Sequence, residues 1–161
     1  FEQLWPRYPD CLGIVIQAYL YRSWDDVRRL SDEGCRIRLC KGAYMEPPDV
    51  AFPRKRDVDS NYLRLMEFLL LSPAHTAIAT HDSRMIDSAT RFVAQRGISD
   101  GRYEFQMLYG VRRAFQLALV EQGYRMRVYV PFGRNWAPYF MRRLAERPAN
   151  VLFVLRNLVR D

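Results

Sequence analysis

The sequence predicts an α/β fold with a parallel sheet, and three observations carry this prediction. Short apolar runs typical of buried strands alternate with longer amphipathic stretches typical of helices. The alternation repeats five times, and no two apolar runs are joined directly by a two-residue β-hairpin turn. Polar side chains follow the apolar runs. Strands that alternate with helices without hairpins imply parallel strands joined by right-handed crossovers.

Five strands are expected along the chain. The first, 12–19, is continuously apolar, as is usual for a strand buried on both faces. The second, 36–41, alternates apolar and charged residues and ends in a cation. The other three are expected at 76–80, 103–106 and 125–130.

Helix starts are marked by capping residues. Ser23 is expected to begin the first helix, and Asp26 three residues later completes an approximate capping box. Asp59 or Ser60 is expected to cap the second helix, after a loop at 45–58 rich in proline and charge. Further helices are expected from 83 to 96, from 110 to 121 and from 136 to 147.

The ends of the strands distinguish between two parallel folds. A doubly wound sheet needs a glycine-rich phosphate-binding turn after its first strand, and residues 20–22 (LYR) are nothing like one. A βα barrel collects polar residues at the carboxyl ends of its strands. All five strands end in such residues, which are Gln17, Lys41, Thr80 with His81, Gln106 and Tyr129. The sequence therefore predicts a TIM-like (β/α)8 barrel.

The chain is short for a closed barrel. Eight strands and about 250 residues are typical, whereas the 161 residues here supply five βα units. An open half-barrel would leave two parallel edges unpaired, which favours aggregation. We therefore expect residues 1–161 to be the C-terminal part of a barrel that lacks about three N-terminal strands, completed by that segment or by self-association. The absence of an initiator methionine favours a longer protein.

Composition narrows the classes of partner and compartment. The net charge is +7, but the basic residues are dispersed as doublets, which favours small anionic ligands over nucleic acid. Three cysteines and two histidines show no metal-ligand spacing, and the odd cysteine count indicates a reducing, cytoplasmic compartment. No run of 18 apolar residues predicts a transmembrane helix.

Two clusters of residues could carry chemistry. Arg38, Lys41 and Tyr44 crowd the end of one strand, where they would suit an anionic, planar ligand or form a solvated basic edge. Arg142 and Arg143 could grip a carboxylate bidentately, or could belong to a solvated helix face. Glu146 would steady one guanidinium, and Tyr139 lies on a similar face. His81, at a strand end, could be a base, a ligand, a hydrogen-bond donor to a cofactor or a structural residue.

Six motifs occur in order and at compatible spacings. They are QAY at 17–19, RLCKGAY at 38–44, ATHD at 79–82, EFQMLYG at 104–110, VYVPFG at 128–133 and YFMRRLAE at 139–146. Together they resemble the C-terminal part of the proline dehydrogenase family, especially the small single-function bacterial enzymes. The resemblance extends across nearly the whole chain.

This resemblance implies a distorted βα barrel that binds FAD and oxidises L-proline to 1-pyrroline-5-carboxylate. It implies a membrane quinone as electron acceptor, and a cytoplasmic protein or one peripheral at the inner face of the membrane. The implied catalytic residues are Arg38, which matches an arginine near the flavin N5, with Tyr129, Arg142 and Arg143. The implied FAD-binding residues are Gln17, Arg38, Lys41, Gly42, Ala43, Arg54, Lys55, Thr80, His81 and Gln106. The implied substrate-binding residues are Leu39, Tyr44, Tyr129, Tyr139, Arg142, Arg143 and Glu146.

Two departures from the family pattern leave alternatives open. Cys40 stands where an aliphatic residue is common, and we expect it only to pack. The family's first three strands, with a substrate-side lysine and an acidic residue, have no counterpart in these residues. The alternatives are a catalytically inactive fragment of the same fold and a basic nucleic-acid-binding module, which only the net charge favours.

Overall fold

The computed structural model describes residues 1–42, 44, 46–130 and 132–133, and the description that follows concerns these residues. Five strands form one parallel sheet in the order β1-β2-β3-β4-β5. The strands are β1 (Gly13–Gln17), β2 (Arg36–Cys40), β3 (His75–Ala79), β4 (Tyr103–Leu108) and β5 (Met126–Tyr129). The helices are α1 (Ser23–Ser31), α2 (Lys55–Leu71), α3 (Ser83–Arg96) and α4 (Arg113–Glu121), with 3-10 turns η1 (Trp5–Arg7) and η2 (Asp100–Arg102).

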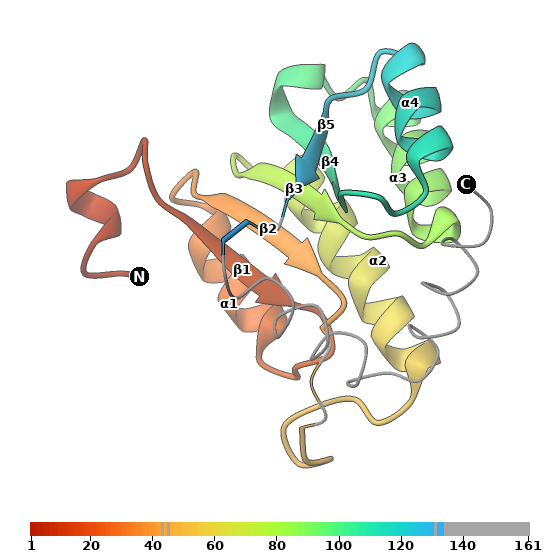
Figure 1. Cartoon of the computed structure of the whole chain (residues 1–161). Coiled ribbons are helices and arrows are strands. Elements are labelled where there is room, and N and C mark those ends of the chain that lie inside the picture. The colour runs from red at the N-terminus through yellow and green to blue at the C-terminus, as the bar shows by residue number, and fades with distance from the viewer. Residues whose placement is uncertain (43, 45, 131, 134–161) are drawn as a thin grey trace.

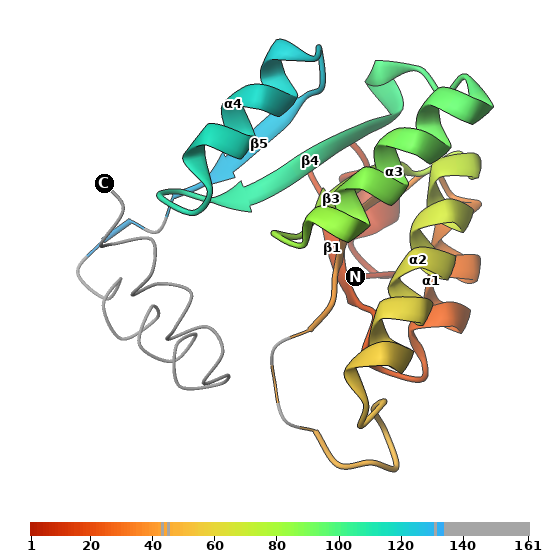
Figure 2. The ribbon, with the colours of Figure 1, turned by 90° about the vertical axis from the view of Figure 1, so that its right-hand side faces the viewer.

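Each strand pairs with its neighbours in the sequence, so the strand order never reverses. The sheet is curved, and α1 to α4 lie along one side of it (Figures 1 and 2). A doubly wound fold would place helices on both faces and reverse its strand order. The predicted α/β fold with sequential βα units is therefore confirmed.

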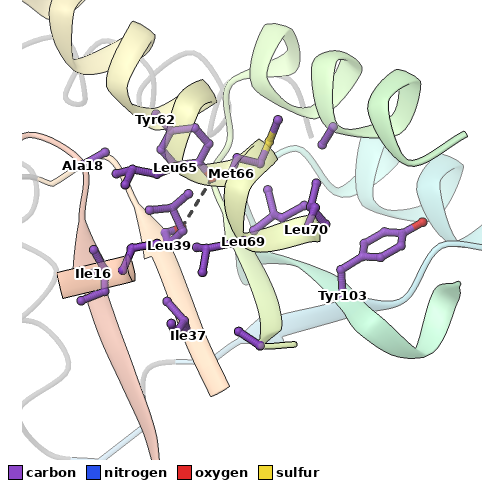
Figure 3. Packing of buried hydrophobic residues seen from close by; sticks show 14 of the residues in the cluster. Ile16, Ala18, Ile37, Leu39, Tyr62, Leu65, Met66, Leu69, Leu70 and Tyr103 are labelled. Atoms are coloured by element: carbon purple, nitrogen blue, oxygen red, sulfur yellow. Dashed lines mark hydrogen bonds between the residues drawn. The ribbon is translucent and has the colours of Figure 1, made fainter. Parts of the chain in front are cut away.

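The core lies between the sheet and its covering helices, and α2 contributes the largest share of it. Ile37 and Leu39 of β2 are fully buried beneath Leu65 and Leu69 of α2, as Figure 3 shows. The Tyr62 hydroxyl, also on α2, donates a hydrogen bond to the carbonyl of Leu39 at 3.4 Å. Burying one such aliphatic side chain stabilises the fold by about 1.5–3 kcal/mol. This apolar layer fixes which residues of each strand face the helices.

The opposite face of the sheet is polar. Successive side chains of a strand point to opposite faces. When Ile37 and Leu39 face the helices, Arg36 and Arg38 must therefore face the other way. The same alternation puts the following residues on the polar face: Val15 and Gln17 of β1, Ala77 and Ala79 of β3, Glu104 and Gln106 of β4, and Arg127 and Tyr129 of β5.

The helix starts expected at Ser23 and at 83 are confirmed, whereas the starts expected near Asp59 and at 110 are wrong, because α4 begins at Arg113. Helix α2 begins at Lys55 and not near Asp59, so the expected loop is shorter and Lys55 is helical. Ser23 does begin α1, but it forms no capping box: its hydroxyl donates to the carbonyl of Leu20, while Asp26 pairs with Arg22. Asp82 caps α3 by accepting a hydrogen bond from the Arg84 amide at 3.1 Å. The helix expected at 136–147 lies outside the described residues.

Candidate functional site

Arg38 lies on the polar face of the sheet and reaches across a neighbouring strand. Its Nε–H donates to Oε1 of Gln106 at 2.7 Å, although β3 lies between β2 and β4. Neighbouring strands are about 4.8 Å apart, so the two backbones are separated by roughly twice that distance. The reach is possible because β3 presents only Ala77 and Ala79 beneath the Arg38 side chain.

The guanidinium of Arg38 also lies over the ring of Tyr129, with its Cζ 5.1 Å from the ring centroid. A cation over an aromatic face is attracted by the ring quadrupole. Three residues that the sequence predicts as site residues, Arg38, Gln106 and Tyr129, are therefore brought together from three strands. Among the described residues, no carboxylate forms an ion pair with Arg38.

Lys41 is held by two carboxylates at the carboxyl end of β2. Its Nζ donates to Asp59 of α2 at 2.5 Å and to Asp82 at 2.7 Å. The Lys41 and Asp59 side chains are each only 15% exposed. Lys55 and Arg84 approach the same carboxylates from more exposed positions. The ammonium of Lys41, predicted to bind a cofactor, is thus engaged with protein carboxylates.

Burial alone would raise the pKa values of Asp59 and Asp82. Hydrogen bonds from Lys41, and from Lys55 in the case of Asp59, outweigh burial and lower both pKa values. Both carboxylates therefore stay ionised at neutral pH. The hydroxyl of Thr80 accepts a hydrogen bond from the Asp82 amide at 3.1 Å, which fixes the turn that carries Asp82.

His81 is neutral in this environment. Burial, with Arg112 and Arg38 nearby, lowers its pKa from 6.5 to about 4. Its Nε2 accepts a hydrogen bond from the Leu108 amide at 3.0 Å, so the proton must lie on Nδ1. Arg112, which has a left-handed φ of 55°, donates to the His81 carbonyl at 2.7 Å. The ring nitrogen Nδ1 is therefore a hydrogen-bond donor at the strand end.

The lowered pKa of His81 predicts a pH-dependent stability. Between pH 6.5 and pH 4 the unfolded chain binds a proton at His81 that the folded chain does not, so stability falls as the pH falls. We expect the free energy of unfolding to drop by about 2 kcal/mol from pH 7 to pH 5, because folding lowers the pKa of His81 from 6.5 to about 4. Urea titrations at the two pH values measure the drop.

The control for this prediction is His81→Asn. Burial also lowers the pKa of His75, so some pH dependence should persist in that variant. An undiminished drop in His81→Asn would show that the pH dependence comes from other groups.

Gly42 follows Lys41 in a conformation with φ of 100°. A Cβ at this position would lie 2.1 Å from Cδ1 of Tyr19, a residue that is only 5% exposed. The Tyr19 amide in turn donates to the carbonyl of Lys41 at 2.9 Å. The backbone after β2 is thus packed directly on an aromatic ring, and only glycine fits there.

The other predicted site residues are more scattered. Gln17 lies at the end of β1 on the polar face, and its side chain makes no hydrogen bond to another described residue. Tyr44 is 48% exposed. Arg54 lies at the start of α2 and pairs with Asp57 at 2.7 Å. Ala43, Tyr139, Arg142, Arg143 and Glu146 lie outside the described residues.

Leu39 differs from the expectation. Its side chain is fully buried between β2 and α2, on the opposite face from Arg38. Adjacent residues of a strand point to opposite faces, so the Leu39 side chain cannot line the same pocket as the Arg38 guanidinium.

Several residues of the site were missed by sequence reasoning. Glu104 and Arg127 lie on the polar face beside Gln106, and Asp59 and Asp82 hold Lys41. Glu104 is two positions before Gln106, so the period of two in a strand could have placed both on one face. Asp59 had no such signal, because a helix brings it from 18 residues away.

None of the helices among the described residues combines the length and the hydropathy that a transmembrane span requires.

Comparisons with known proteins identify the family of this arrangement. The family model "Proline dehydrogenase" matches residues 2–156. Proline dehydrogenase 1 of Bacillus subtilis is 48% identical over 99% of this chain and 55% of its own length. Proline dehydrogenase of Deinococcus radiodurans is 50% identical over 92% of this chain and 48% of its own length. The chain thus spans about half the length of the curated relatives it matches.

Solved structures agree with these sequence matches. Proline utilization A (PutA) from Bdellovibrio bacteriovorus superposes with a TM-score of 0.73 at 33% identity, over 82% of this chain and 16% of that one. A bifunctional PutA protein gives a TM-score of 0.74 at 28% identity, over 92% of this chain and 17% of that one. With its fold, its polar strand ends and a family match over nearly its whole length, the chain belongs to the proline dehydrogenase family.

Proposed function

We propose that the complete protein oxidises L-proline to 1-pyrroline-5-carboxylate with FAD as its cofactor and a membrane quinone as electron acceptor. The observation that carries the proposal is the convergence of Arg38, Gln106 and Tyr129 on one face of the sheet. Family membership supports the reaction, since the matched relatives are named proline dehydrogenases.

The residues at the strand ends fit a flavin. An isoalloxazine ring offers carbonyl oxygens and ring nitrogens that need hydrogen-bond donors, and its reduced form carries negative charge. The polar face offers the guanidinium of Arg38, the amide of Gln17 and the Nδ1–H of neutral His81. In this proposal Lys41, Gly42, Ala43 and Thr80 contribute the turns beside the flavin, and Arg54 and Lys55 lie toward its adenosine end.

In this proposal, the chain's own residues position one another and stabilise charge at the cofactor. FAD, when bound, supplies the two-electron oxidation chemistry. Arg38 supplies a positive charge that no described carboxylate neutralises, and Oε1 of Gln106 holds the guanidinium in place by accepting its Nε–H. Tyr129 supports the guanidinium from below. The arrangement stabilises charge that develops at the cofactor without any reorganisation of the protein at that moment.

The substrate contacts of this proposal lie mostly outside the described residues. Arg142 and Arg143 would bind the proline carboxylate, Glu146 would pair with one of them, and Tyr44, Tyr129 and Tyr139 would form walls of the pocket. Fixing the carboxylate orients the reacting C–H bond, which is an effect of position and not of proton transfer.

We also propose that residues 1–161 form the C-terminal part of a barrel. On their outer sides, β1 and β5 pair with no other strand among the described residues, and parallel edges of this kind are normally covered. The rest of the protein, or a second copy, would complete the sheet.

Replacing Arg38 by methionine tests the proposal. In the complete protein, we expect Arg38→Met to weaken FAD binding or slow flavin reduction by proline at least about tenfold, the equivalent of about 1.4 kcal/mol. The matched control is Arg36→Met, on the same strand and face but at the opposite end. Flavin absorbance and stopped-flow reduction measure both quantities. If Arg38→Met retains FAD and reduces as fast as wild type, the assignment of Arg38 fails.

A further inference from the structure

Glu104, which the sequence reading assigned no role, lies at the centre of a polar network on the open face of the sheet. Its Oε1 accepts a hydrogen bond from Nε2 of Gln106 at 2.6 Å. Arg127 of β5 binds the same carboxylate with two nitrogens, at 2.6 and 2.9 Å. The Glu104 side chain is 12% exposed, whereas that of Arg127 is 62% exposed.

The contact with Glu104 determines which way the Gln106 amide points. An amide has one end that donates and one end that accepts. Because the NH2 group of Gln106 donates to Glu104, its oxygen must face the opposite direction, where it accepts the Nε–H of Arg38. A flipped amide would place its NH2 group against a guanidinium that can only donate. The carboxylate thus sets the orientation of the amide, and the amide sets the position of Arg38.

The network also separates two like charges. Glu104 forms its ion pair with Arg127, while Arg38 is held by a neutral amide oxygen. Burial alone would raise the pKa of Glu104, but hydrogen bonds from Arg127 and Gln106 outweigh burial and lower it. The carboxylate is therefore ionised at neutral pH. The positive charge of Arg127 is neutralised, whereas no carboxylate among the described residues neutralises that of Arg38.

The two alanines of β3 make this arrangement possible. Ala77 is level with Arg38 on one side and with Glu104 on the other, and Ala79 is level with Gln106. A larger side chain at either alanine would lie between the guanidinium and the amide. The small side chains of β3 let residues of β2 and β4 interact directly.

We propose that Glu104 is a positioning residue for Arg38, acting through the amide of Gln106. The effect of Glu104 on the cofactor rests on the proposed function, whereas the effect of Glu104 on Arg38 is independent of that function. Loss of the carboxylate frees the amide to rotate, and the Nε–H of Arg38 loses its fixed acceptor. The terminal nitrogens of Arg38 are then no longer held in one direction.

The first test needs no cofactor. In the complete protein, nitrogen-15 NMR follows exchange of the Arg38 Nε–H with water, and the signal is assigned by its loss in Arg38→Lys. We expect exchange to be about fivefold faster in Glu104→Ala and in Gln106→Ala, because a side-chain hydrogen bond of about 1 kcal/mol is lost in each. The double variant should exchange no faster than Gln106→Ala, since Glu104 acts through that amide.

Two further variants sharpen this test. Arg127→Ala removes the other partner of Glu104 but keeps the Glu104–Gln106 hydrogen bond, so it should leave the exchange rate unchanged. Glu104→Gln preserves the shape of the side chain and replaces Glu104→Ala if that variant does not fold. It should speed exchange by a smaller factor, because its amide still offers Gln106 an acceptor. Unchanged exchange in a folded Glu104 variant, or additive effects in the double variant, overturns the proposal.

The second test connects the network to the cofactor. We expect the flavin reduction potential of Glu104→Ala to fall by about 30 mV, which is a tenfold loss of preference for the reduced form in a two-electron couple. If the Arg38 Nε–H exchanges faster in Glu104→Ala than in wild type but the wild-type protein binds no flavin, the proposed function fails and the positioning role stands. If flavin binds and Glu104→Ala changes neither exchange nor potential, the positioning role fails alone.

Discussion

Replacing Gly42 by alanine is expected to destabilise the protein by about 4 kcal/mol. Two costs add: forcing a methyl group into a packed site costs about 1–3 kcal/mol, and an unfavourable backbone conformation costs a similar amount. The methyl group would meet the buried ring of Tyr19 at 2.1 Å, and the φ of 100° is one that alanine rarely adopts. Urea unfolding of Gly42→Ala and wild type measures the difference.

Gly97 provides a matched control. It also has a positive φ, of 62°, but a Cβ there would meet no atom within 4 Å. Gly97→Ala should therefore show only the backbone cost of about 1 kcal/mol. Equal losses in the two variants would mean that the contact with Tyr19 contributes nothing. In the complete protein, a loss of FAD in Gly42→Ala alone would support the proposed role of this turn.

The second large effect is expected from Lys41→Met. Removing one partner of a buried ion pair leaves uncompensated charge and costs about 3–5 kcal/mol. We expect about 3 kcal/mol, because Asp59 and Asp82 keep weaker contacts with Lys55 and Arg84. Urea unfolding at pH 7 measures this loss.

The pH dependence distinguishes a charge effect from a packing effect. Lys41 helps to hold the pKa values of Asp59 and Asp82 below their usual range. The contribution of Lys41 to the stability of the folded protein is therefore present above about pH 4 and is lost as these carboxylates are protonated. The difference between Lys41→Met and wild type should therefore narrow below pH 4. Lys55→Met, at a side chain that is 61% exposed, should cost less than about 1 kcal/mol. A Lys41→Met deficit that is constant with pH would contradict the charge argument.

The strands and most helices could be predicted because their signals are local. The alternation of apolar and charged residues around Ile37 and Leu39 marks β2, and Gly97 ends α3 in a left-handed conformation. The start of α2 could not be predicted in the same way. Its first residue follows Arg54, which provides no side-chain cap, so the capping residues Asp59 and Ser60 suggested a later start.

The site residues at strand ends could be predicted from the sequence. The partners that other elements contribute could not. Arg38 and Gln106 follow from alternation and from the polar ends of parallel strands. The partners of Lys41 do not, because Asp59 comes from a helix and Asp82 from another strand's exit. Sequence reasoning recognised the cation but not the carboxylates that hold it, since their proximity exists only in the folded chain.

The two interactions of Asp82 have a consequence for local motion. One carboxylate oxygen caps the first turn of α3, and the other binds Lys41 at the end of β2. Opening the turn after β2 therefore removes one of the two contacts that fix the Asp82 carboxylate, and fraying of α3 removes the other. Segments that share such a contact tend to open and close as one cooperative unit. Amide hydrogen exchange in the first turn of α3 and at the end of β2 should accordingly report a single opening event.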